Sequence, residues 1–235
     1  MSETLEVDDS LVVWSEPKES LGERPLVVLL HGRGSHEHDL MQLAPVLLPG
    51  VVYAALRAPL PFFGGGFTWF PPAQPGLPSA EGVATATRGI LAWLDRLAPA
   101  GPVAVLGFSQ GGALATHLMR FAPERFAAFV NLSGFVVPGE CPADERLAEL
   151  RPPLFWGRDV ADPVIPTEAT DATERWLPAH CTLTRRRYEG IGHGISMEEV
   201  EDVREFLRER VFTAPGSTDA QAAKADTART ETTRD

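Results

Sequence analysis

The sequence predicts an α/β protein with a mostly parallel central sheet and helices on both of its faces. Short apolar runs alternate along the chain with segments in which apolar residues recur at helical spacing. Within the runs the apolar residues are consecutive, as strands buried on both faces require. The 235 residues are 44% hydrophobic and 23% charged, which is typical of globular proteins. We therefore expect residues 1–212 to form one domain.

The predicted strands are five apolar runs, at residues 25–31, 51–56, 102–108, 126–132 and 153–156. A further strand is expected before the glycine-rich segment 190–194. Apolar residues at helical spacing predict four helices. Their stripes are Leu40, Leu43, Ala44 and Leu47; Val83, Ala86, Ile90, Leu94 and Leu97; Leu114, Ala115, Leu118 and Phe121; and Val200, Val203, Leu207 and Val211. Residues 196–199 resemble a capping box that opens the last helix.

Two stretches interrupt this alternation. Residues 57–79 are so rich in proline and glycine that they exclude a long helix or a central strand, and they predict a long ordered loop of functional importance. Residues 213–235 are rich in threonine, alanine and charge, with almost no large apolar side chains. Such a segment cannot offset the entropy of ordering itself, so the sequence predicts a disordered C-terminal tail.

Bulk composition argues against several classes of protein. The net charge of −11, without a dense run of lysine or arginine, argues against a surface for nucleic acid or anionic membranes. Residues 1–10 lack the pattern of a secretory signal, and no apolar run approaches the roughly 20 residues that span a bilayer. Cys141 and Cys181 are too few for a disulfide framework. We therefore expect a cytoplasmic protein without stable membrane insertion.

The motif Gly107-Phe108-Ser109-Gln110-Gly111 is the strongest chemical signal. Gly-x-Ser-x-Gly alone is weak, but here it follows an apolar strand and opens a helical stripe. That setting is the one in which a sharp, strained turn exposes a nucleophilic serine. The start of the following helix directs backbone N–H groups and its positive dipole end toward a developing oxyanion. Ser109 is the predicted nucleophile.

A serine nucleophile needs a base, and histidine has the appropriate pKa. His193 is the best candidate because it lies in a glycine-rich loop before the C-terminal helix. His36 and His38 stand beside Glu37 and Asp39, a cluster that leaves open an alternative interpretation as a metal site. The remaining three histidines are expected in supporting, packed or surface positions: His31, His117 and His180.

The base in turn needs a carboxylate that orients it and stabilises the imidazolium. Asp159 and Asp162 both follow the strand that ends near Trp156, which places an acid between the serine and the histidine in chain order. Either side chain could reach His193. We favour Asp162 because Pro163 makes a rigid turn after it.

The oxyanion needs two backbone N–H donors. Gln110 supplies one, directly after the serine. The sequence His31-Gly32-Arg33-Gly34 follows the first predicted strand, and its glycines allow the backbone to face a substrate, so the Arg33 amide is the second expected donor.

These motifs, in this order and spacing, resemble the phospholipase/carboxylesterase family, which includes acyl-protein thioesterases. The resemblance spans roughly residues 25–211 and rests on His-Gly-x-Gly, Gly-Phe-Ser-Gln-Gly-Gly, Asp-Pro-Val-Ile-Pro and Tyr-Glu-Gly-x-Gly-His. It implies an α/β-hydrolase fold without a large lid domain. It also implies a catalytic triad of Ser109, Asp162 and His193, with oxyanion amides from Arg33 and Gln110. The implied substrates are short to medium acyl esters, lysophospholipids or acyl thioesters.

The loop at 57–79 departs from the family pattern, because Trp69-Phe70 is followed by prolines where members often carry an aspartate. Phe63, Phe67 and Trp69 are candidates to line an apolar acyl pocket, and a satellite core that pins the loop is the alternative.

The sequence thus predicts a serine ester hydrolase that requires neither metal nor cofactor and acts on a small-molecule ester or thioester, with a homodimer as a possible assembly. Three alternatives stay open. One is a serine peptidase, which shares the triad, and another is a catalytically silent scaffold that binds a partner. The third is a metal hydrolase built on His36 and His38.

Overall fold

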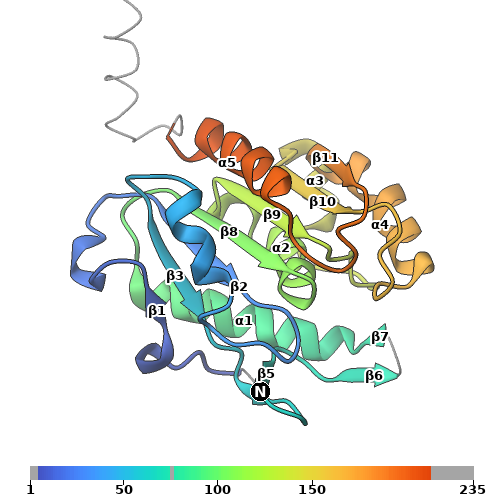
Figure 1. Ribbon diagram of the computed structural model, residues 1–235, viewed down its shortest axis with the longest axis horizontal. Helices are drawn as coiled ribbons and strands as arrows, with labels where there is room; N and C mark the ends of the chain where they lie inside the picture. The colour runs from blue at the N-terminus through green and yellow to red at the C-terminus, as the bar shows by residue number, and fades with distance from the viewer. Residues whose placement is uncertain (1–4, 75–76, 213–235) are drawn as a thin grey trace, which may run out of the picture.

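The computed structural model describes residues 5–74 and 77–212, so the predicted disordered tail lies outside the described residues (Figure 1). Its centre is a seven-stranded sheet with strand order β1-β3-β2-β8-β9-β10-β11, in which only the β1–β3 pair is antiparallel. The strands are β1 Val13–Trp14, β2 Leu26–Leu30, β3 Val52–Leu56, β8 Val103–Phe108, β9 Ala128–Leu132, β10 Pro153–Asp159 and β11 Thr182–Tyr188. The prediction of a mostly parallel sheet is confirmed.

All five predicted strands are present, with small shifts at their ends. β9 begins two residues later than expected, and β10 continues three residues beyond Trp156 to Asp159. Every residue of β2, β3 and β9 is buried, which explains why these runs are continuously apolar. The sixth expected strand is β11, at the edge of the sheet. The sequence reasoning missed β1, whose two residues carry no strand-length pattern.

Helices cover both faces of the sheet, as predicted. They are α1 Ala80–Leu97, α2 Gln110–Phe121, α3 Asp144–Leu150, α4 Thr167–His180 and α5 Met197–Val211. Side chains of α1, α2, α3 and α4 join the apolar core on one face. On the other face, a second core is built against α5 and the 3₁₀ helix η3 Leu40–Val46 (Figure 1). The catalytic candidates lie at the carboxyl ends of the parallel strands, because Ser109 follows β8, Asp162 follows β10 and His193 follows β11.

Three helical details differ from expectation. The stripe at Leu40 forms a 3₁₀ helix that contains Pro45, a residue without the N–H needed for regular α-helical bonding. Helices α3 and α4 were not predicted, because their sequences are largely polar and only a narrow stripe is buried. His180 therefore ends α4 and stacks on Trp176, rather than lying in a surface turn.

The expected loop at 57–79 contains two short antiparallel hairpins. The first pairs β4 Leu60–Pro61 with β5 Phe67–Thr68, and the second pairs β6 Pro72–Gln74 with β7 Leu77–Pro78. Three consecutive glycines with positive φ, at 64–66, allow the first hairpin to turn. No helix in the described part of the chain has both the length and the apolar character needed to cross a bilayer.

Candidate active site

Ser109 stands at a sharp turn between β8 and α2, as the motif predicts. Its φ of 54° and ψ of −112° are strained for a residue with a side chain, and its N–H donates to the Leu132 carbonyl at 2.7 Å. A Cβ atom at Gly107 would collide with the carbonyl oxygen of Gly111, so the approach of strand and helix requires glycine. The turn thus holds Ser109 in one backbone geometry.

The structure brings Ser109, His193 and Asp162 together from three loops. The Oγ of Ser109 lies 2.8 Å from Nε2 of His193, and the Nδ1 of the same ring lies 2.7 Å from Oδ2 of Asp162. The His193 side chain is 15% exposed and the Asp162 side chain 4%. The ring of Phe108 packs against His193 with 5.0 Å between centroids. The imidazole is therefore held between a carboxylate and a hydroxyl, with one edge open to solvent.

The two aspartates that the sequence left open have different surroundings. Oδ1 of Asp162 accepts from the Val164 N–H at 2.8 Å, which leaves Oδ2 to His193. Asp159 is buried, and its carboxylate accepts from the N–H groups of Ala161 and Gly192, both at 2.7 Å. These bonds lower the pKa of Asp159. Asp159 thus ties the loop that carries His193 to the end of β10 and makes no bond to the imidazole.

The loop after β2 is braced against the first hairpin. The N–H of Gly34 donates to the Phe67 carbonyl and that of Phe67 to the Ser35 carbonyl, both at 2.8 Å. His31 is buried, and its ring nitrogens contact Gly32 O at 2.7 Å and Ala58 N at 3.1 Å. Because Ala58 N–H can only donate, Nε2 accepts and Nδ1 carries the proton. His31 therefore supports the loop, as predicted, and burial lowers its pKa.

The side chain of Gln110 links the serine turn to the hairpin region. Its Oε1 accepts from the Trp69 N–H at 2.9 Å, and its Nε2 donates to the Phe70 carbonyl at 2.8 Å. Its amide also contacts the hydroxyl of Thr68. The sequence reasoning gave Gln110 only a backbone role. Its side chain has a second one, because it fixes the loop over the site to the residue after the candidate nucleophile.

The structure does not place the three aromatic candidates on one wall of a pocket. Trp69 is 0% exposed, belongs to the core, and donates its indole N–H to the His31 carbonyl at 2.9 Å. Phe67 packs against that core and under the guanidinium of Arg57, whereas Phe63 is 99% exposed at the hairpin tip. The acyl-pocket expectation is wrong for Trp69, because its ring pins the loop to the sheet.

A cavity of about 340 Å³ lies beside His193 instead. Apolar side chains of η3 and of the loop before α5 line it together with Phe108: Leu40, Leu43 and Ile195. Asp39 and Gln42 add polar atoms at its edge. The helical spacing of Leu40 and Leu43 predicts a helix, but it does not show that part of their stripe borders a cavity.

The cluster around His36 and His38 is organised by an ion pair. Glu37 is buried and forms a two-point contact with Arg57, which lowers the pKa of the carboxyl to about 2. The Asp39 carboxylate accepts from the Ser35 hydroxyl at 2.6 Å. Among the described residues, no group of three or more His, Cys, Asp or Glu side chains could hold a metal ion.

Glu199 is a buried acid whose carboxylate has no hydrogen-bond partner in the described part of the chain. It lies in the first turn of α5 and is 0% exposed. A Cβ atom at Gly157 would collide with this carboxyl group, which therefore packs directly on the backbone of β10. Burial, together with the nearby Asp202, raises the pKa of Glu199 to about 8.

The chain is similar to curated carboxylesterases and acyl-protein thioesterases. A probable carboxylesterase from Oryza sativa subsp. japonica is 29% identical over 152 residues, 60% of this chain and 57% of the relative. Acyl-protein thioesterase 1 from Saccharomyces cerevisiae is 29% identical over 106 residues, 43% of this chain and 47% of the relative. The chain thus spans about half the length of these two curated relatives.

The solved structure of esterase PE8 superposes with a TM-score of 0.69 and 27% identity, and the match covers 88% of this chain and 99% of that one. The chain has the α/β-hydrolase fold, and no large separate lid is evident in the described residues. The model of the phospholipase/carboxylesterase family matches residues 16–211, most of the chain. The resemblance found in the motifs is therefore confirmed, and the protein belongs to the phospholipase/carboxylesterase family.

Proposed function

We propose that the protein is a serine carboxylic-ester hydrolase that acts through Ser109, His193 and Asp162. One observation carries the proposal: the His193 imidazole contacts the Ser109 hydroxyl at 2.8 Å through Nε2 and the Asp162 carboxylate at 2.7 Å through Nδ1. This is the arrangement in which a histidine can take a proton from a serine while a carboxylate fixes its tautomer. Membership in the family supports the same assignment.

The reaction has two steps. Oγ of Ser109 attacks the ester carbonyl while its proton passes to Nε2 of His193, and collapse of the tetrahedral intermediate expels the alcohol or thiol, which takes that proton. The acyl-serine remains. Water then attacks the acyl carbonyl with His193 again accepting the proton, and the carboxylic acid leaves as Ser109 regains its hydrogen. Asp162 stabilises the imidazolium that forms in each step.

The backbone amides of Arg33 and Gln110 are the proposed oxyanion donors. Gln110 is the first residue of α2, so its N–H lies at the positive end of the helix dipole. Arg33 lies between Gly34, whose N–H donates to the Phe67 carbonyl of the first hairpin, and Gly32, whose carbonyl accepts from the Ser35 N–H within the same loop. A braced donor needs no reorganisation when charge develops on the substrate oxygen.

We propose esters or thioesters with short to medium acyl chains as substrates. The similarity to proteins named carboxylesterase and acyl-protein thioesterase supports this class. A cytoplasmic location and a homodimer stay predictions from the sequence.

A fluorophosphonate probe tests the nucleophile directly. We expect the wild-type protein to gain the mass of one phosphonyl group, located on the peptide that contains Ser109, and Ser109→Ala to gain none. Ser133→Ala is a matched control, since Ser133 also has a positive φ and directly follows a strand of the sheet, β9, but is buried. It should label like the wild type. Intact-protein and peptide mass spectrometry measure the result.

Labelling that persists in Ser109→Ala, or a wild-type protein that is never labelled, would contradict the proposed nucleophile. Hydrolysis of p-nitrophenyl acetate and butyrate then tests the activity. An aminoacyl p-nitroanilide cleaved faster than both esters would favour the peptidase alternative.

A further inference from the structure

Two cavities are lined by consecutive stretches of the same two segments, residues 39–51 and residues 193–204. The first is the cavity beside His193, lined by residues of 39–43 and 193–195 together with Phe108. The second has a volume of about 640 Å³ and is lined by residues 44–51 and by Met197, Val200, Glu201 and Arg204 of α5. Because their linings continue along the same two segments, we call them together the η3–α5 groove.

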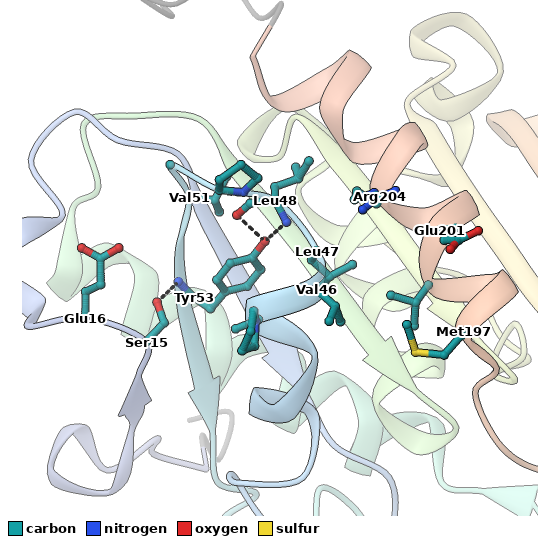
Figure 2. Close-up of a pocket in the computed structure, with 15 residues that line it drawn as sticks. Ser15, Glu16, Val46, Leu47, Leu48, Val51, Tyr53, Met197, Glu201 and Arg204 are labelled. Carbon is teal, nitrogen blue, oxygen red and sulfur yellow. Dashed lines mark hydrogen bonds between the residues drawn. The ribbon is translucent and has the colours of Figure 1, made fainter.

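The cavity beside His193 is lined mainly by apolar side chains, whereas the second cavity has both apolar and charged side chains in its lining, and some of its apolar side chains reach solvent. Figure 2 shows the second cavity, with Val46 and Leu47 on one side and Met197 on the other. Val46 is 39% exposed and Met197 60%, which makes them two of the few large hydrophobic side chains exposed in the described residues. Tyr53 forms part of the wall, with its hydroxyl satisfied by the backbone of Leu48. The lining of the groove therefore offers contact area to a hydrocarbon chain.

We propose that the η3–α5 groove binds the alkyl chain of the alcohol or thiol leaving group, so that the substrate class is esters of aliphatic alcohols or thiols. This inference rests on the proposed function. The first cavity begins at His193 and Phe108, and its walls are the aliphatic side chains of Leu40, Leu43 and Ile195. A chain that leaves the reacting centre past His193 enters the groove directly.

The chemistry of the triad decides which half of the substrate lies there. His193 must give its proton to the leaving oxygen or sulfur, so the leaving group sits on the histidine side of the scissile bond. The proposed oxyanion donors, the backbone amides of Arg33 and Gln110, bind the carbonyl oxygen of the substrate. Neither residue lines the groove. The groove thus starts at the group that touches the leaving atom and runs away from the carbonyl.

The far end of the groove is charged. Glu201 and Arg204 stand on α5, and Glu16 lies near the opposite rim (Figure 2). A hydrocarbon chain long enough to reach these groups would desolvate them without offering a hydrogen bond, which is unfavourable. We therefore expect kcat/KM to rise with each added methylene of the alcohol at first and to level off as the chain lengthens.

Acetate esters of increasing alcohol length provide the test. Ethyl and hexyl acetate have leaving groups of nearly equal acidity and form the same acetyl-enzyme, so the ratio of their kcat/KM values reports contacts to the alcohol chain. We expect hexyl acetate to be favoured by about tenfold or more, because each buried methylene favours binding. Met197→Asp, which places a carboxylate at the groove, should reduce this ratio at least fivefold. Leu150→Asp is the control, since Leu150 is exposed at the end of α3 and should leave the ratio unchanged.

Three results would overturn the inference. The first is a ratio near one in the wild type that Met197→Asp does not alter. The second is a Met197→Asp effect confined to acyl length, seen as a changed ratio of p-nitrophenyl octanoate to acetate with an unchanged hexyl-to-ethyl ratio. The third is no hydrolysis of any ester, which would overturn the proposed function as well. The first two leave ester hydrolysis intact, so they separate a wrong groove assignment from a wrong activity.

Discussion

Asp162→Asn is expected to lower kcat/KM for p-nitrophenyl acetate by about 10⁴-fold at neutral pH. The Oδ2 atom of Asp162 lies 2.7 Å from Nδ1 of His193. An amide in its place removes the charge that stabilises the imidazolium, and its NH₂ group favours the tautomer whose Nε2 carries the proton. That tautomer cannot accept a proton from Ser109, so the chemical step slows while the fold stays intact. Steady-state kinetics, with circular dichroism as the check on folding, measure the effect.

Asp159→Asn is the matched control for this prediction. The two aspartates are three residues apart, but Asp159 bonds to backbone N–H groups of its own turn and of Gly192. Its loss should weaken the attachment of the His193 loop and lower thermal stability, with a decrease in kcat/KM of less than about a hundredfold. A larger kinetic loss in Asp159→Asn than in Asp162→Asn would reverse the assigned roles.

Glu199→Gln is expected to raise the unfolding free energy at alkaline pH by a few kcal/mol relative to its effect at pH 4 to 5. Burial raises the pKa of Glu199 to about 8 in the folded protein, from the ordinary value of 4.5 that the side chain has in the unfolded chain. Below pH 4.5 the carboxyl is protonated in both the folded and the unfolded state, so its ionisation does not change the free energy of unfolding. Between pH 4.5 and pH 8 the carboxyl ionises in the unfolded chain but keeps its proton in the folded protein, so the free energy of unfolding falls as pH rises. Glutamine cannot ionise, and the variant avoids this decline.

Denaturant unfolding of both proteins at several pH values between 4 and 9 measures the difference. The gain in unfolding free energy of Glu199→Gln over the wild type should grow from about pH 4.5 and reach a plateau above about pH 8. Glu198→Gln is the control, because Glu198 is exposed in the same helical turn and should give a nearly flat difference. A Glu199→Gln difference that is equally flat would show that the carboxyl is ionised in the folded state at neutral pH.

The position of the candidate nucleophile was predictable because its requirements are local. All of them lie within about a dozen residues around Ser109: a strand, a close approach that admits only glycine, and the start of a helix. Asp162 and Asp159 show the limit of such reasoning. Both follow β10, and the choice depends on which backbone N–H groups each carboxylate meets, including that of Gly192 more than 30 residues later.

Residues without a regular period were predicted less well. Phe63, Phe67 and Trp69 lie within seven positions of one another, but one is exposed, one half-buried and one in the core. The glycine turn between the strands of the hairpin breaks any alternation that could have ordered them. Glu199 was expected to complete a capping box. Ser196 does accept from the Glu199 N–H at 3.1 Å, but the carboxyl turns inward onto Gly157 instead of toward the Ser196 N–H.

The bonds made by the Gln110 side chain have a consequence for how the sequence can change. Two of its partners, Trp69 N–H and the Phe70 carbonyl, are main-chain atoms, which every non-proline residue supplies. Substitutions at neighbouring positions can therefore accumulate without loosening the attachment of the loop to the nucleophile turn. The same attachment allows residues of this loop to change while the backbone around the candidate nucleophile stays in position.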